Sequence, residues 1–226
     1  MTDGKSILVG GHAVNVWAHF YFQRIEAELG QFLPFTSKDI DFYGEMQFLD
    51  RVIKNFGGSK SMSQPRGPVI GRVDLEIDGV MRIVEVLHSV HGLSPKDLAR
   101  SSPLVIEVGQ CRARVLDPVS LLKAKIHNAA DLKQEERNDV RHVKIMILCV
   151  REFVLDTLDG VKLGKLSQRN LVNLLENVHQ VIADPKAQKG QKLWGFDYAN
   201  AWPAKSLRAS GLTKVISFLA HRLSGI

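Results

Sequence analysis

The first part of the chain alternates apolar runs with glycine breaks. Residues 6–11, SILVGG, form a short apolar run that ends in two glycines, which predicts a buried strand followed by a tight turn. Apolar residues then recur at roughly helical spacing from His12 to Leu29, and Gly30 is predicted to end that helix. The chain is therefore expected to begin with a strand, a Gly-Gly turn and a helix.

A pattern of period two follows. Asp39 and Asp41 alternate with Ile40 and Phe42 in the segment 36–44. Successive side chains of a strand point to opposite faces, so this segment is predicted to be a strand with both carboxylates on one face. The two apolar side chains then lie on the other face.

The next segments predict one helix, one loop and a hairpin. Residues 45–56 have a helical pattern, and 59–68 are a polar loop by composition. The runs 69–77 and 80–87 are predicted to be strands, because Asp78-Gly79 between them is a strong signal for a two-residue hairpin turn.

A second strand pair, 104–108 and 112–116, is predicted to turn at Gly109-Gln110. Helical patterns follow over 119–132 and 139–154. The last third is expected to hold two more helices and a loop with four aromatic residues. These are Trp194, Phe196, Tyr198 and Trp202.

The change of pattern at Leu116 predicts two regions, a mixed α/β region over 1–116 and a helical region over 117–226. Together they predict an α+β fold in which helices flank a mixed β-sheet and a helical region follows. With 226 residues, of which 45% are hydrophobic and 24% charged, the chain can bury a sizeable core.

Composition also narrows the location and the partners. The sequence has neither an apolar stretch of the roughly 18 residues that a membrane span needs nor a signal-peptide pattern at its start, so a cytoplasmic protein is expected. Cys111 and Cys149 lie far apart and form no metal-binding pair, so we expect buried thiols. The net charge of +6 is compatible with a polyanionic partner such as RNA or a nucleoside triphosphate.

Two features carry candidate chemistry. Paired carboxylates such as Asp39 and Asp41 repel each other unless a cation compensates, and Mg²⁺ prefers such oxygen ligands together with phosphates. Alternating acids also occur on the solvated faces of edge strands. Gly10-Gly11 before a helix would let the backbone approach phosphate oxygens, although the same pair can simply end a strand. It matches neither a P-loop nor the dinucleotide-binding fingerprint.

The order of these features resembles the nucleotidyltransferases of the polymerase-beta superfamily. The matching segments are LVGGHAVNVW, SKDIDFYG and RIVEVLHSVHGL, and VLDPVSLLKAKIHN followed by ERNDVRHVKIM is similar to the toxin-type, abortive-infection branch. The resemblance covers about residues 7–150. This chain departs from the pattern at His12, where the family often has a small residue, and at Glu85, where an aspartate is common.

The resemblance implies a nucleotidyltransferase-like sheet and a set of site residues. Asp39, Asp41 and Glu85 would be the catalytic and metal-binding carboxylates, with Mg²⁺ and an NTP such as ATP as cofactors. Gly10, Gly11 and Lys125 would contact the nucleotide. Asp74 and Glu76 remain alternatives to Glu85, an ordinary solvated lysine is the alternative interpretation of Lys125, and Asp139 either matches a family acid or favours a helix start.

The implied activity is transfer of a nucleoside monophosphate from Mg-NTP to an acceptor, which could be an RNA end, a protein hydroxyl or a small molecule. The alternative is a non-catalytic nucleotide-binding or protein-interaction module of the same fold. The third carboxylate discriminates between the two. His88 and His91 have no Cys or acid that completes a zinc set, and the C-terminal aromatics could stack bases or pack on the helical core.

Overall fold

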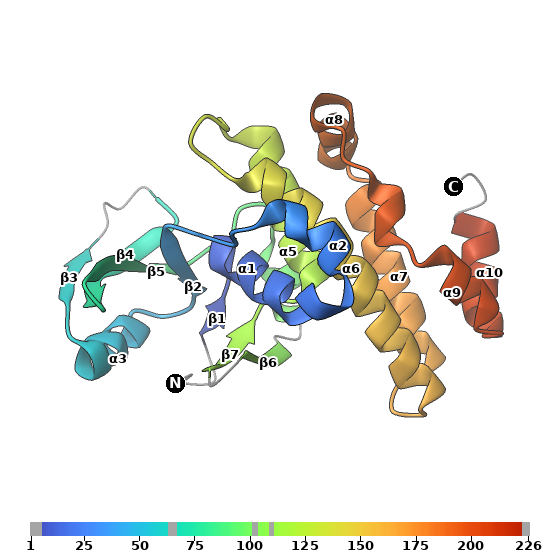
Figure 1. The fold of residues 1–226 in the computed structure, drawn as a ribbon, viewed down its shortest axis with the longest axis horizontal. Helices are drawn as coiled ribbons and strands as arrows, with labels where there is room; N and C mark the ends of the chain where they lie inside the picture. The colour runs from blue at the N-terminus through green and yellow to red at the C-terminus, as the bar shows by residue number, and fades with distance from the viewer. Residues whose placement is uncertain (1–5, 63–66, 101–103, 109–110, 223–226) are drawn as a thin grey trace.

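The computed structural model describes residues 6–62, 67–100, 104–108 and 111–222. The seven strands form one mixed sheet in the order β3-β4-β5-β2-β1-β7-β6 (Figure 1). They are β1 (Ile7–Leu8), β2 (Asp39–Tyr43), β3 (Ser59–Met62), β4 (Val69–Ile77), β5 (Val80–Leu87), β6 (Leu104–Val108) and β7 (Cys111–Val115).

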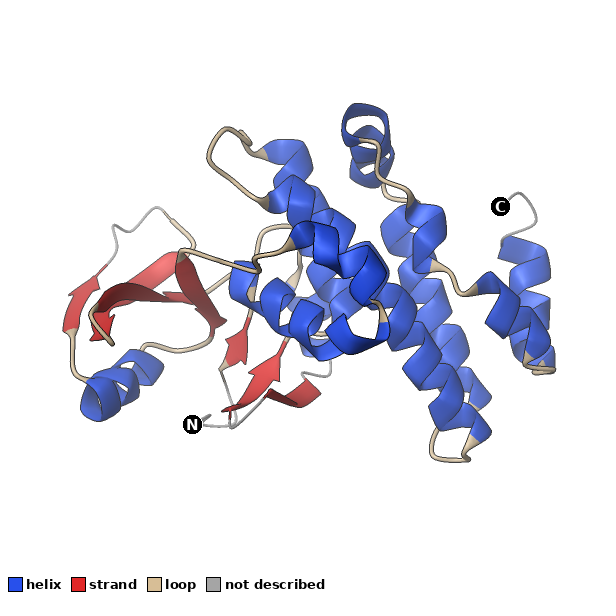
Figure 2. Ribbon diagram, viewed as in Figure 1, coloured by secondary structure: helices blue, strands red, loops and turns tan. Residues whose placement is uncertain are grey.

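Helices account for most of the remaining chain, and those of the C-terminal half gather beyond one end of the sheet (Figure 2). The α-helices are α1 (Gly10–Tyr21), α2 (Glu26–Leu29), α3 (Gln47–Phe56), α4 (Pro95–Arg100), α5 (Pro118–Asp131), α6 (Asp139–Lys162), α7 (Gln168–Ile182), α8 (Pro185–Trp194), α9 (Ala204–Ala209) and α10 (Thr213–Arg222). The short 3₁₀ helices are η1 (Phe22–Arg24), η2 (Gly30–Phe32) and η3 (Tyr198–Ala201).

Strand β2 lies in the middle of the sheet. It pairs in parallel with β5 on one side and antiparallel with β1 on the other, and β1 in turn pairs in parallel with β7. The β4–β5 hairpin turns at Asp78 and Gly79, whose φ angles of 52° and 73° are those of the predicted two-residue turn. A mixed sheet with flanking helices and a helical C-terminal region confirms the predicted α+β fold class.

The apolar face of the β4–β5–β2 part of the sheet packs against α3. The cluster there is formed by Phe48, Leu49, Val52, Val73, Leu75, Val84 and Val86, with Ile40 and Phe42 of β2 packed on it. Because neighbouring residues of a strand face opposite ways, this packing directs Asp39 and Asp41 to the other face, as predicted.

A larger core cluster joins the two predicted regions. Trp17 and Tyr21 of α1, both 1% exposed, belong to the same buried cluster as residues from α5 to α10. The indole of Trp17 also donates a hydrogen bond to the carbonyl oxygen of Leu116 (2.9 Å). The boundary near Leu116 itself stays a prediction.

Several predicted boundaries are wrong. The helix predicted over 12–29 is divided: α1 ends at Tyr21 and passes into η1, and the backbone of Ile25 leaves the helical region (φ −134°, ψ 39°) before α2 begins. Residues 59–62 of the predicted loop form strand β3, which pairs with β4 although its four side chains are exposed. The rest of that loop, 63–66, lies outside the described residues.

The helical region is also more extensive than predicted. Helix α6 continues to Lys162 rather than 154, and four α-helices follow it where two were expected. The strand pair β6–β7 matches its prediction within one residue, and its turn at 109–110 lies outside the described residues. Of the helices in the described ranges, none has the length and apolar character that crossing a bilayer requires.

Candidate functional site

The three predicted carboxylates lie on one face of two adjacent strands. In the parallel register of β2 and β5, Asp41 lies directly opposite Glu85, and Asp39 lies opposite Ile83. Residues paired in this way point to the same side of a sheet. Asp39 and Asp41 of the central strand β2 are therefore on the same face as Glu85 of the adjacent strand β5.

Burial and neighbouring acids disfavour the ionised form of two of these carboxyl groups. Burial raises the pKa of Asp41 to about 7, the nearby Glu85 and Asp39 add to the shift, and Lys125 opposes it. Burial and the charge of Asp39 also raise the pKa of Glu85, and Arg72 counteracts part of that shift. Such a carboxylate pair is stabilised when a cation joins it.

The two glycines bring the start of a helix against these acids. Gly10 and Gly11 are the first two residues of α1, and Gly10 has a φ of 67°. A Cβ atom on Gly10 would lie 1.9 Å from Oδ2 of Asp41, so only glycine allows this approach. The backbone N–H of Val9 also donates to the carbonyl oxygen of Asp41 (2.9 Å).

The start of α1 is suited to an anion. Val9 at the N-cap offers no side-chain hydrogen bond to the first turn, which contains no acidic residue. The N–H groups of a helix start and its dipole attract phosphate oxygens. A cradle without Cβ atoms beside paired carboxylates fits a metal-bound triphosphate better than either group alone.

A metal at this face would need ligands beyond the protein. Among the residues that the structure describes, no three His, Cys, Asp or Glu side chains are grouped so that they could hold a metal ion alone. Mg²⁺ usually keeps waters and takes one or two carboxylates together with substrate phosphates. Asp39 and Asp41 fit that ligand set.

Glu85 is better placed than its two alternatives. Asp74 is bound by Arg72, whose Nε donates to Oδ1 of Asp74 at 2.9 Å. Glu76 is exposed and pairs with Met81 close to the hairpin turn. Only Glu85 of these three lies opposite Asp41.

Lys125 is buried rather than solvated. Its Nζ donates to Oδ1 of Asp139 at 2.9 Å, and Arg137 Nε donates to Oδ2 of the same carboxylate at 2.6 Å. Burial alone would raise the pKa of Asp139, but Lys125 and Arg137 hold it below its ordinary value. Lys125 also acts electrostatically on Asp41, so its charge lies within reach of the acidic face.

Three further side chains lie at this face, and the sequence analysis singled out only the first of them, His12. Nδ1 of His12 donates to the carbonyl oxygen of Asp39 (3.1 Å), and burial lowers its pKa. A Cβ on Gly11 would lie 2.5 Å from Oγ of Ser37 and 3.1 Å from Cε1 of His142. Burial, followed by the charge of Lys125, lowers the pKa of His142 to about 3, so this imidazole is neutral. Ser37 lies two residues before Asp39, and His142 lies three residues after Asp139. Their nearness in sequence to these two acids is the one signal that could have drawn attention to them.

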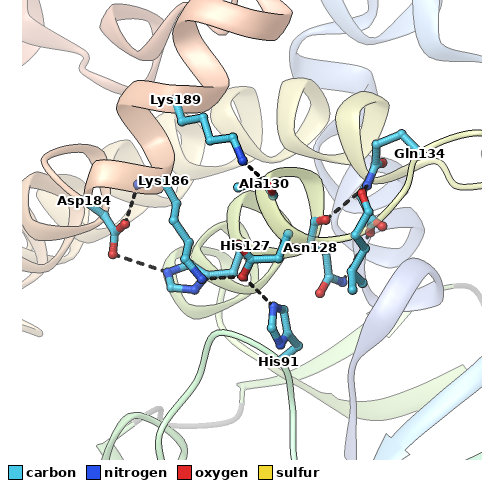
Figure 3. A network of polar contacts seen from close by, with 11 residues as sticks. His91, His127, Asn128, Ala130, Gln134, Asp184, Lys186 and Lys189 are labelled. Atoms are coloured by element: carbon cyan, nitrogen blue, oxygen red, sulfur yellow. Dashed lines mark hydrogen bonds and ion pairs between the residues drawn. The ribbon is translucent and has the colours of Figure 1, made fainter.

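The other candidate groups lie apart from this face. His88 contacts the carbonyl oxygen of Gly67 (3.2 Å), whereas His91 donates to Asp131 (2.9 Å) in a separate polar network with His127 and Asp184 (Figure 3). They form no metal pair.

The C-terminal aromatics mostly pack inside the protein. Phe196, Tyr198 and Trp202 are buried in the large core cluster, and Trp194 is 38% exposed. This confirms packing on the helical core rather than a stacking platform. Cys149 is buried and unpaired, and burial raises its pKa. The side chain of Cys111 lies outside the described residues.

Comparison with known proteins gives one similar structure. No protein-family model matches the chain. No curated protein matches it either. Among solved structures, the chain is similar to an antigenic nucleotidyltransferase-like protein from Paracoccidioides brasiliensis, with 16% sequence identity over 83% of this chain and 84% of that chain and a TM-score of 0.39. The function proposed below rests on the residues of this chain.

Proposed function

We propose that this chain is a nucleotidyltransferase that moves a nucleoside monophosphate from Mg-NTP to a hydroxyl group. The observation that carries the proposal is the register of Asp41 opposite Glu85, with Gly10 packed directly against Asp41. These contacts gather two kinds of group, paired carboxylates and a side-chain-free helix start, that a metal-bound triphosphate needs together.

Each residue has a separate role in this proposal. Asp39 and Asp41 hold Mg²⁺, which neutralises phosphate charge when bound. Gly10 and Gly11 offer backbone N–H groups to phosphate oxygens. Glu85 accepts the proton of the acceptor hydroxyl while the hydroxyl oxygen forms a bond to the α-phosphorus. The bond between the α-phosphorus and the oxygen that bridges to the β-phosphate breaks, and pyrophosphate is released.

Lys125 supports the site from within the protein. Its ion pair with Asp139 fixes the ammonium group between α5 and α6, where its field reaches Asp41. We propose that this field, together with that of Arg137, stabilises the negative charge of the triphosphate. The acceptor is an RNA end, a protein hydroxyl or a small molecule.

Incubation with each α-labelled NTP, Mg²⁺ and either total RNA or cell lysate tests the activity. Transfer of label that is lost with EDTA and in Asp41→Asn supports the proposal. NTP binding without transfer to any acceptor favours a non-catalytic nucleotide-binding module, and absence of Mg²⁺-dependent NTP binding contradicts both.

Substitution of Glu85 tests its role as the base. We expect Glu85→Gln to slow single-turnover transfer by about 10²- to 10⁴-fold while NTP affinity changes little, because the triphosphate is held by the other two acids and the glycines. Asp74→Asn is the matched control, since Asp74 already pairs with Arg72. Full activity of Glu85→Gln would contradict the assignment.

A further inference from the structure

A cavity of about 460 Å³ lies on the other side of α5 from the acidic residues. Lys125 points to Asp139, whereas Lys123 lines the cavity, and residues two apart on a helix lie on nearly opposite sides. Its walls come from α4 to α7 and the first residue of β6, and Asp39, Asp41 and Glu85 are not among them. The cavity is therefore a separate feature from the proposed catalytic site.

Helix α7 presents a stripe of primary amides to this cavity. They are Asn170, Asn173, Asn177 and Gln180. Their spacing of three and four residues places them on one face of the helix. The opposite face carries Leu171, Leu175 and Val178, which are fully buried (0% exposed) and hold α7 in the core. The amide stripe is thus a fixed surface on a well-packed helix.

Most of these amides are free to bind a ligand. Asn170 caps its own helix with Ser167, but Asn173, Asn177 and Gln180 are exposed, and their side-chain amides bond to no residue within the described part of the chain. A primary amide offers one acceptor and two donors, which match the C=O and N–H of a peptide group. The stripe is roughly 15 Å long at about 1.5 Å per residue, the length of four or five extended residues.

The charges of the cavity select for a cation. Among the described residues that line it, Asp97, Asp117 and Asp184 carry carboxyl groups and Lys123 carries an ammonium group, and the carboxyl group of Asp117 accepts from the backbone N–H groups of Val119 and Ser120. Lys123 is paired with Asp97 (3.0 Å), and Asp184 is also faced by His127 (3.3 Å; Figure 3). An acidic lining in a chain of net charge +6 opposes phosphates and attracts lysine or arginine.

An apolar cavity of about 480 Å³ adjoins the first one. The two cavities share Leu104 and Phe153. The other residues that line the second cavity are Trp17, Phe20, Tyr21, Val105, Asp156, Thr157 and Leu166. Phe20, Val105 and Leu166 are 41%, 48% and 42% exposed, so a large apolar side chain could cover them.

We propose that the groove formed by these two cavities binds an extended peptide segment of a partner protein, with lysine or arginine beside the amide stripe and a large apolar residue in the second cavity. Amides bind the peptide backbone, the carboxylates select the basic side chain and the aromatic residues hold the apolar one. Nucleic acid fits poorly, because its phosphates would meet the carboxylates.

The 226-residue chain, fluorescently labelled, is applied to a positional-scanning library of immobilised hexapeptides. We expect retention to favour lysine or arginine together with a large apolar residue, and to disfavour proline, which lacks the backbone donor. Anisotropy with the best hexapeptide should show roughly tenfold weaker binding for Asn173→Ala/Asn177→Ala, which loses two hydrogen bonds. The exposed helical amide of Asn55, on α3, lies outside the groove, so Asn55→Ala should bind as the wild type.

Three results would overturn the proposal. One is a library profile without a basic preference, and another is equal affinity in the wild type and Asn173→Ala/Asn177→Ala. The third is full competition by oligouridine, which would identify the groove as a nucleic-acid site. Tenfold weaker binding of the same hexapeptide with N-methylated backbone amides would support it, because only backbone recognition depends on those donors.

Discussion

Asp41 combines two properties that rarely coincide, a half-buried carboxylate and an acidic neighbour. Its pKa of about 7 means that it is partly protonated at neutral pH. A metal binds only the ionised form, so the affinity for Mg-NTP should rise about tenfold per pH unit below the pKa and level off above pH 8. Calorimetry between pH 5.5 and 8.5 in two buffers of different ionisation enthalpy would measure both the affinity and the proton released.

The Tm of Asp41→Asn, measured at two pH values and compared with that of the wild type, is the control for this prediction. Between the ordinary pKa of 3.8 and about 7, the folded protein keeps a proton that the unfolded chain has released, so stability falls as pH rises through this window. Asparagine removes that loss. The variant should therefore bind no Mg-NTP yet have a Tm that exceeds the wild type more at pH 8 than at pH 4.5, and a lower Tm at pH 8 would contradict the charge assignment.

At the residue scale, the sequence predicts only part of the site. The alternation of Asp39 and Asp41 with apolar residues was enough to place both acids on one face. The position of Asp41 opposite Glu85 depends on parallel pairing of β2 and β5, which no local pattern encodes. His142 was missed for the same reason, because its contact with Gly11 joins the first turns of two helices far apart in sequence.

The start of helix α1 depends on Gly10. In Gly10→Ala, positive φ costs about 1–2 kcal/mol, and the new methyl group would also clash with Asp41, 1.9 Å away. Gly79→Ala is the matched control, since Gly79 has a φ of 73° with no atom within 4 Å. We expect Gly10→Ala to lower Tm more than Gly79→Ala does. Gly10→Ala should also abolish Mg-NTP binding, whereas Gly79→Ala should retain it. Equal effects of the two substitutions would show that Asp41 does not crowd Gly10.

Helices α5 and α6 are joined by the buried pair of Lys125 and Asp139. Removing one partner of a buried pair leaves a charge uncompensated and typically costs about 3–5 kcal/mol. Lys125→Met should fall near the lower limit, because Arg137 still binds Asp139. Urea unfolding would measure this loss, and Lys125→Met/Asp139→Leu should recover part of it. An unchanged free energy of unfolding in Lys125→Met would argue that the lysine serves the nucleotide rather than the fold.

At the element scale, prediction succeeds where a local signal decides the structure. The Asp78-Gly79 turn requires positive φ at both residues, which these residue types supply, and the hairpin begins and ends as predicted. Strand β3 has no such signal: SKSM is polar and exposed, and it is a strand only because β4 offers backbone partners. Likewise, the apolar period of 12–29 continues through the break at Ile25, so periodicity alone predicted one helix.

At the scale of the whole molecule, the two predicted regions share one core. Trp17 of α1 packs on Phe153 of α6, with ring centroids 6.0 Å apart, and helix α1 lies against both α5 and α6. The peptide groove also draws its walls from both regions, since β6 and α7 line it together. Helix α5 also lines the groove through Lys123, so a partner bound there would contact the helix that carries Lys125.

A shared core predicts that the chain unfolds in one transition, because neither region can expose its side of the cluster without the other. Two variants with single tryptophans report on the two regions separately. Trp194→Phe/Trp202→Phe leaves Trp17, which is 1% exposed in α1, and Trp17→Phe/Trp194→Phe leaves Trp202, which is 6% exposed and packs against Phe218. In each variant, the urea midpoint from tryptophan fluorescence should coincide with the midpoint from far-UV circular dichroism. Separate midpoints within one variant would instead mean that residues 1–116 and 117–226 unfold independently.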